Sequence, residues 1–82
     1  MKAKIIRTII DNHGNEYKID NDVVFELLRN DKCYTCVGVI SRIGEEVFTI
    51  RNVLIDQMPV AATLTIKYEE VKDGVLKRVS YS

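Results

Sequence analysis

Two cysteines separated by two residues are the side chains of this sequence best suited to chemistry. Cys33 and Cys36 lie in the segment DKCYTCVGV, residues 31–39. Thiolates at this spacing bind zinc in ribbon-like sites and exchange disulfides in thiol oxidoreductases. A structural zinc site needs two further nitrogen or sulfur ligands, and His13 is the only other soft ligand. A redox pair needs a helix N-terminus in a βαβ unit, and no βαβ pattern is evident.

The residues around the two cysteines predict a strand. Residues 32–43 are rich in Val, Ile, Tyr and Thr, and turn residues bound them on both sides. Side chains three residues apart on a strand point to opposite faces of the sheet. We therefore expect the two sulfur atoms to diverge, to share no metal ion and to remain reduced thiols.

The other titratable side chains do not form a catalytic set. His13 lies beside Gly14 in a predicted turn and is expected to be solvated. Glu45 and Glu46 are adjacent, so on a strand they face opposite ways and cannot share a proton. Because no nucleophile, base and orienting group can be assembled, we predict no catalytic residue, no metal ligand, no cofactor and no enzymatic activity.

Length and composition indicate one small folded domain over residues 1–82. The chain is 46% hydrophobic and 29% charged, with twelve basic and twelve acidic residues. A chain this short forms a single core, and zero net charge creates no global attraction to nucleic acid or an anionic membrane. We see no signal segment and no run of about 18 apolar residues, so we expect a cytoplasmic protein without membrane contact.

Turn residues divide the chain into strands. We predict strands near 3–11 and 16–19 around the turn at residues 12–15, then strands at 23–28, 32–43 and 47–51. Alternating residues in 63–68 place Leu64, Ile66 and Tyr68 on one face of a further strand. Asp73-Gly74 is typical of a two-residue hairpin turn, which would place Glu70 opposite Lys77 and Glu69 opposite Arg78.

Two regions stay open between alternatives. Residues 21–29 fit a capped helix or a strand, and we favour the strand because β-branched and aromatic residues begin the segment. Residues 52–62 contain Pro59 and read as an irregular crossing loop with at most one helical turn. The predicted fold is all-β or β-rich α+β: an antiparallel meander or partly open barrel of five to seven strands, with room for one short helix near 21–29 or 52–60.

Two segments resemble those of Sm-like small β-barrel proteins. Residues 27–40, LLRNDKCYTCVGVI, are similar to the first Sm-like motif, in which a long strand bends at a glycine, here Gly38. Residues 66–71, IKYEEV, resemble the segment that closes such barrels, including those of the YolD-like proteins. The resemblance implies a small barrel. The Asp and Asn of the Sm-like uridine pocket have no counterparts in residues 43–48, so no site residue is assigned from it.

Two functions are compatible with this sequence. The first is a non-enzymatic interaction module that self-associates through edge strands or binds another protein, since pairing protects the edges and enlarges a small core. In this hypothesis the acidic residues 9–31 of one copy meet the basic residues 1–8 of another. The alternative is weak nucleic-acid binding, for which the candidate residues are Arg42, Arg51, Lys67, Lys77 and Arg78.

Overall fold

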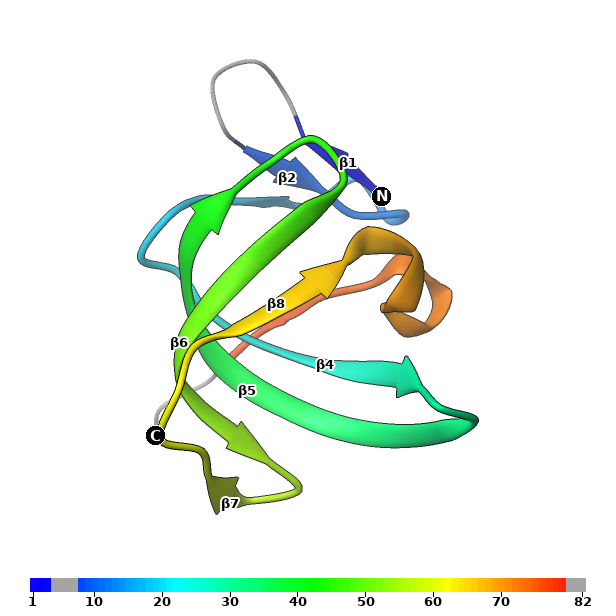
Figure 1. Ribbon diagram of the computed structural model, residues 1–82. Coiled ribbons are helices and arrows are strands. Elements are labelled where there is room, and N and C mark those ends of the chain that lie inside the picture. Colours follow the sequence, from blue (N-terminus) through cyan, green and yellow to red (C-terminus); the bar gives the residue numbers. More distant parts are fainter. Residues whose placement is uncertain (4–7, 80–82) are drawn as a thin grey trace.

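The computed structural model describes residues 1–3 and 8–79 and consists of two antiparallel sheets with two short 3₁₀ helices (Figure 1). The all-β prediction is confirmed. Within the described ranges no helix is long and apolar enough to cross a membrane. The elements are β1 (Lys2–Ala3), β2 (Ile9–Ile10), β3 (Glu16–Tyr17), β4 (Asp22–Arg29), β5 (Lys32–Ile43), β6 (Val47–Ile55), β7 (Met58–Pro59), β8 (Leu64–Lys67), η1 (Tyr68–Glu70), η2 (Lys72–Gly74) and β9 (Lys77–Arg78).

The larger sheet has the strand order β7-β6-β5-β4-β9, and β8 pairs with β6. It curls around the core but does not close into a barrel. Alternate residues of β4 are buried, as the period of two predicts, and the same alternation holds in β5 up to Ile40 and in β6 up to Ile50. Phe48 is fully buried, stacks on Tyr68 at 5.5 Å between ring centroids, and meets Phe25 edge-on at 5.6 Å. These three rings anchor the inner face of the sheet.

The predicted turn at Asn30-Asp31 joins β4 to β5, and the strand alternative for residues 21–29 is therefore the correct one. Both turn residues have positive φ, 55° and 61°, as a two-residue hairpin loop of type I′ requires. All eight residues of β4 pair with β5. This pairing decides against the helix near 21–29. The predicted reversal near Gly44 is also confirmed, since it connects β5 to β6.

An irregularity in β5 lies where the sequence predicts a bend. The register between β5 and β6 shifts between Val37 and Val39, on either side of Gly38. A Cβ atom built on Gly38 would lie 2.8 Å from the Ile50 Cδ1 atom, so β6 passes too close for a side chain. Glycine is therefore needed here for close approach of two strands.

The Asp73-Gly74 turn forms, but the hairpin predicted around it is wrong. Both residues have positive φ, 58° and 62°, and the Val75 N–H donates to the Lys72 carbonyl. The flanking segments nevertheless separate: residues 68–70 form η1, and β9 pairs with β4. The predicted pairs of Glu70 with Lys77 and of Glu69 with Arg78 are absent from the ladder. The turn itself was predictable from its two residues. The segments before and after it, however, make their contacts with parts of the chain that are distant in the sequence.

Two other segment predictions need correction. The described ends of the strand predicted over residues 3–11 belong to two different strands, because β1 pairs antiparallel with β2. Residues 4–7 of that prediction lie outside the described residues. Residues 52–62 are not a crossing loop with a helical turn. Residues 52–55 end β6, and Asp56 and Gln57 form a second turn with positive φ that leads into β7. Pro59 lies in this edge strand, the position in a sheet where proline is tolerated.

The buried carboxylate of Asp11 ties the N-terminal sheet to the segment before β9. It accepts hydrogen bonds from the backbone N–H groups of His13 and Asn15, both at 3.0 Å, and of Leu76 at 3.2 Å. Burial opposes ionisation, but the three N–H donors outweigh it and lower the pKa of Asp11. The Tyr17 hydroxyl also donates to the Leu76 carbonyl at 2.7 Å. These bonds fix the smaller sheet against the edge of the larger one.

Candidate functional site

The two thiols lie on opposite sides of β5, as the strand prediction requires. Cys33 is exposed, whereas Cys36 is fully buried in the core. Burial raises the pKa of the Cys36 thiol to about 11, so it stays protonated and unreactive near neutral pH. No cluster of three metal-binding side chains occurs in residues 1–3 and 8–79. The Cys-x-x-Cys pair therefore belongs to the sheet, with one thiol on each of its faces.

The five basic candidates are divided between two parts of the larger sheet. Arg42 and Lys67 are exposed on the outer side of β5 and β8. Arg51 of β6 forms an ion pair with Asp20 at 3.1 Å. Lys77 and Arg78 lie on β9, which pairs with β4 instead. The structure therefore does not gather all five into one basic surface.

Arg78 and the aromatic rings already have partners within the molecule. The Arg78 guanidinium lies 5.1 Å from the centre of the buried Tyr17 ring and donates to the Glu16 carbonyl at 2.8 Å. Phe25, Phe48 and Tyr68 are buried in the core. A platform for nucleobases needs rings that are free to stack. Among the described residues Tyr34 is the one aromatic side chain with intermediate exposure.

An ion pair covers the outer edge of β8. Arg29, at the end of β4, contacts both carboxylate oxygens of Glu70, at 2.8 and 2.9 Å. Arg29 also donates to the Thr65 carbonyl at 3.1 Å, and Glu70 accepts the Lys67 N–H at 3.0 Å. The hydrogen bonds from Arg29 hold the pKa of Glu70 at about 2 despite its partial burial. The pair thus occupies edge groups that a further strand would need.

The other strand edges are also partly blocked. Arg78 occupies the Glu16 carbonyl of β3. The Leu76 N–H and carbonyl, which precede β9, are taken by Asp11 and Tyr17. On β7, Pro59 has no N–H to donate. These contacts disfavour the addition of a further strand at the edges, so the faces of the sheet are the better candidates for contact with a partner.

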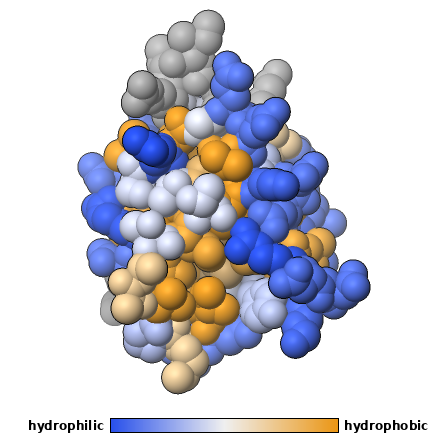
Figure 2. Space-filling model, in the orientation of Figure 1, coloured by the Kyte–Doolittle hydropathy of each residue, from blue (hydrophilic) through white to orange (hydrophobic). Residues whose placement is uncertain are grey.

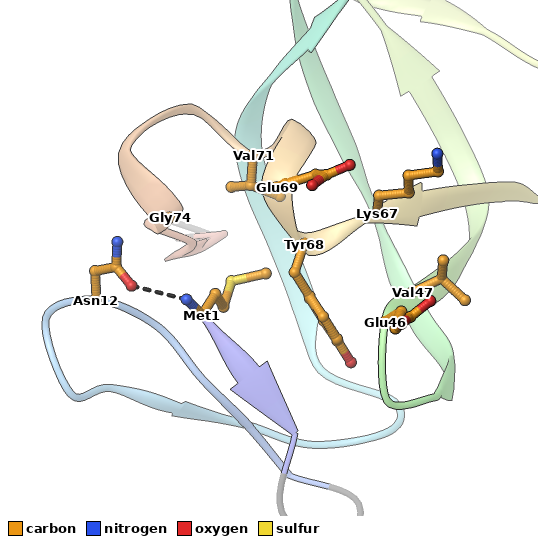
Figure 3. Close-up of a pocket in the computed structure, with 9 residues that line it drawn as sticks. All are labelled: Met1, Asn12, Glu46, Val47, Lys67, Tyr68, Glu69, Val71 and Gly74. Carbon is orange, nitrogen blue, oxygen red and sulfur yellow. Dashed lines mark hydrogen bonds between the residues drawn. The ribbon is translucent and has the colours of Figure 1, made fainter.

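A cleft of about 700 Å³ lies between the N-terminal strands and η1 (Figure 3). Met1 and Asn12 lie on one side, Lys67 and Glu46 on the other, and Tyr68 lies between them. The Met1 ammonium donates to Asn12 at 2.9 Å. The Tyr68 hydroxyl donates to the Gly44 carbonyl at 2.6 Å, and burial raises the pKa of Tyr68 to about 12. The hydroxyl is therefore held as a structural donor rather than as an acid or base.

Apolar side chains reach the surface in two places. Figure 2 shows apolar side chains gathered down the middle of one face, with hydrophilic side chains on both flanks. The half-buried hydrophobic residues that pack against the core from outside are Met1, Tyr34, Ile55, Val60 and Leu64. The second place is a cross-strand line on the outer face of the larger sheet. We call it the outer row, and its members are Lys77, Val24, Val37, Leu54 and Pro59.

The outer row runs without interruption across five strands, β9, β4, β5, β6 and β7. Its three central members, Val24, Val37 and Leu54, are only half-buried, whereas their neighbours Val23, Cys36 and Val53 are buried on the inner face. Alternation within each strand suggested which residues face outward. The alignment of the three strands depends on ladder register, which is why sequence reasoning missed this surface.

The contact between Arg29 and Glu70 was also not predicted from the sequence, because 41 residues separate them in the chain. The only local signal was that each lies beside a predicted turn or strand end.

Comparisons with models of protein families, with curated proteins and with solved structures find no match for this chain.

Proposed function

We propose that this protein is a non-enzymatic interaction module that self-associates. The observation that carries the proposal is the outer row, which is apolar across four strands, β4 to β7, has half-exposed side chains at its centre and ends at Lys77 of β9. Charged residues flank it: Asp20 pairs with Arg51 on one side, and Glu26 pairs with Lys72 at 3.3 Å on the other. An apolar centre with a charged rim is the composition of a protein interface.

Partner contact through a face is favoured over strand addition at an edge. The contacts of Arg29, Glu70 and Arg78 occupy edge groups that an added strand would have to displace. The acidic residues 9–31 are also partly used within the molecule, since Asp11 binds backbone N–H groups and Asp20 and Glu26 are ion-paired. Lys4 and Arg7 of the basic segment lie outside the described residues.

Sedimentation velocity tests self-association directly. We expect the 9.4 kDa chain to convert to a species of twice that mass as its concentration rises to about 100 μM. A protein that remains a monomer throughout this range contradicts the proposal.

Weak nucleic-acid binding, which the resemblance to Sm-like barrels suggests, is the second candidate. One observation favours it: Arg42 and Lys67 lie on the same outer side of the β5–β6–β8 ladder, separated by the hydroxyls of Thr49 and Thr65. Phosphate contacts would make affinity fall steeply with salt. Titration of labelled single-stranded RNA and DNA at about 50 mM salt tests it, since electrostatic attraction is strong there. Absence of binding under that condition removes this candidate.

A further inference from the structure

The smaller sheet docks on the segment of chain that leads into β9. The Asn12 N–H donates to the Gly74 carbonyl at 2.8 Å. The Asp11 carboxylate accepts the Leu76 N–H at 3.2 Å, and the Tyr17 hydroxyl donates to the Leu76 carbonyl at 2.7 Å. These two side chains satisfy both backbone groups of Leu76, so they take the place that a neighbouring strand would have beside this segment. The docking contacts are therefore specific and confined to a short stretch of chain.

One turn, between β3 and β4, joins the smaller sheet to the larger one (Figure 1). The Asn21 N–H donates to the Lys18 carbonyl at 3.1 Å, and Asp20 has a φ of 74°. Such a turn favours glycine or asparagine at the position of Asp20, because positive φ is costly for most other residues. Ile19, in the same turn, is 39% exposed. The connection thus combines backbone strain with an exposed apolar side chain, and an extended hinge would relieve the strain.

We propose that two copies of this chain exchange their smaller sheets, so that the smaller sheet of each copy docks beside β9 of the other. The turn between β3 and β4 opens into an extended hinge, and the two hinges pass each other at a two-fold axis. Asp11 and Tyr17 of each copy then bind Leu76 of the other. A second copy is the partner that this docking surface fits, because the exchange re-forms contacts already present within one chain.

The exchange needs neither a new complementary surface nor a free strand edge. The exchanged sheet replaces only its own counterpart, so the contacts of Arg29, Glu70 and Arg78 that block the edges stay compatible with it. This inference rests on the proposed self-association and names the part of each chain that produces it. It does not depend on contact between the outer rows of the two copies.

Isotope-filtered NMR tests the exchange directly. Labelled and unlabelled chains are unfolded together in urea and refolded, which gives mixed dimers, and size exclusion separates the dimer from the monomer. In the mixed dimer we expect nuclear Overhauser effects between Tyr17 of an unlabelled chain and Leu76 of a labelled one, because the hydroxyl of Tyr17 lies 2.7 Å from the Leu76 carbonyl oxygen. The monomer fraction should give no such signal between chains.

Substitutions of Asp20 test the hinge, and their expected effects have opposite directions. Asp20→Gly removes the cost of positive φ in the closed turn, so it should weaken dimerisation by about tenfold. Asp20→Val raises that cost and should strengthen dimerisation by about tenfold. Asp20→Asn is the matched control, because it loses the ion pair with Arg51 but tolerates positive φ, and its dimerisation constant should equal that of the parent. Circular dichroism verifies that the variants are folded before sedimentation is measured.

The outcomes separate this inference from the proposed function. If the unmodified chain stays a monomer, self-association is refuted and the exchange with it. If the chain dimerises without the signal between Tyr17 and Leu76 of different chains, only the exchange is refuted. The signal supports the exchange, and opposite shifts for Asp20→Gly and Asp20→Val support the turn between β3 and β4 as its hinge. Equal dimerisation of these two variants refutes that hinge.

Discussion

Replacing Glu70 with glutamine tests how the larger sheet is held together where it does not close. The side chain keeps its shape but loses its charge. Glu70 binds Arg29 through two hydrogen bonds and accepts the backbone N–H of Lys67, while Arg29 also donates to the Thr65 carbonyl. This group of contacts connects the end of β4 to β8 and η1. We expect its loss to destabilise the whole fold rather than one loop.

The expected cost follows from the pKa of Glu70. Its decrease from 4.5 to about 2 corresponds to at most about 3.4 kcal/mol, at about 1.36 kcal/mol per pKa unit. The Arg29 side chain is 33% exposed, so solvent screening reduces this value. We therefore expect Glu70→Gln to lower the free energy of unfolding by about 2 kcal/mol near neutral pH, equivalent to a decrease of about 10 °C in Tm.

The same pKa determines how the effect depends on pH. Because the folded state lowers the pKa, the stabilisation is complete above 4.5 and is lost as the pH falls toward about 2. The difference between the parent and Glu70→Gln should therefore shrink to less than about 0.5 kcal/mol at the acidic end of this window.

Urea unfolding followed by circular dichroism measures both quantities. Glu26→Gln is the matched control, since Glu26 of β4 is also ion-paired, with Lys72 of η2, but both partners are about half exposed. It should change stability little at either pH. A cost for Glu70→Gln below about 0.5 kcal/mol near neutral pH, or one that persists unchanged in acid, would refute this account of the ion pair.

Three further predictions concern the buried polar group, the thiols and the close strand approach. Asp11→Ala should lower the free energy of unfolding by about 2–4 kcal/mol in thermal unfolding, because it leaves the buried Leu76 N–H and the part-buried N–H groups of His13 and Asn15 without this acceptor; a cost below about 1 kcal/mol contradicts this. The native chain should expose one thiol to a chromogenic disulfide reagent, Cys33, and Cys36 should react only after denaturant is added; rapid reaction of both thiols would contradict the burial of Cys36. Gly38→Ala should cost about 1–3 kcal/mol through overlap with Ile50, and an unchanged Tm would show that β6 can move aside.

Local sequence determined most of the strands and their turns. The alternation in β4, β5 and β8 depends only on which face of a strand is buried, and a two-residue period expresses that directly. Asn30-Asp31 and Asp73-Gly74 adopt positive φ because these residue types tolerate it at low cost. The divergence of Cys33 and Cys36 follows from the same period. Each of these features involves residues within one turn or one strand.

Tertiary structure decided which strands pair and which side chains meet. Residues 75–79 carry no signal that β9 should join β4 rather than fold back on residues 68–72. The choice depends on distant contacts, such as Arg29 with Glu70 and Asp11 with Leu76. The division of the basic candidates between two parts of the sheet has the same origin. Periodicity in the sequence predicts on which face of its strand a side chain lies, but it does not predict which residue of another strand lies beside it. Pairing energies come from segments far apart in the chain, so the outer row exists only once the ladders have fixed their register.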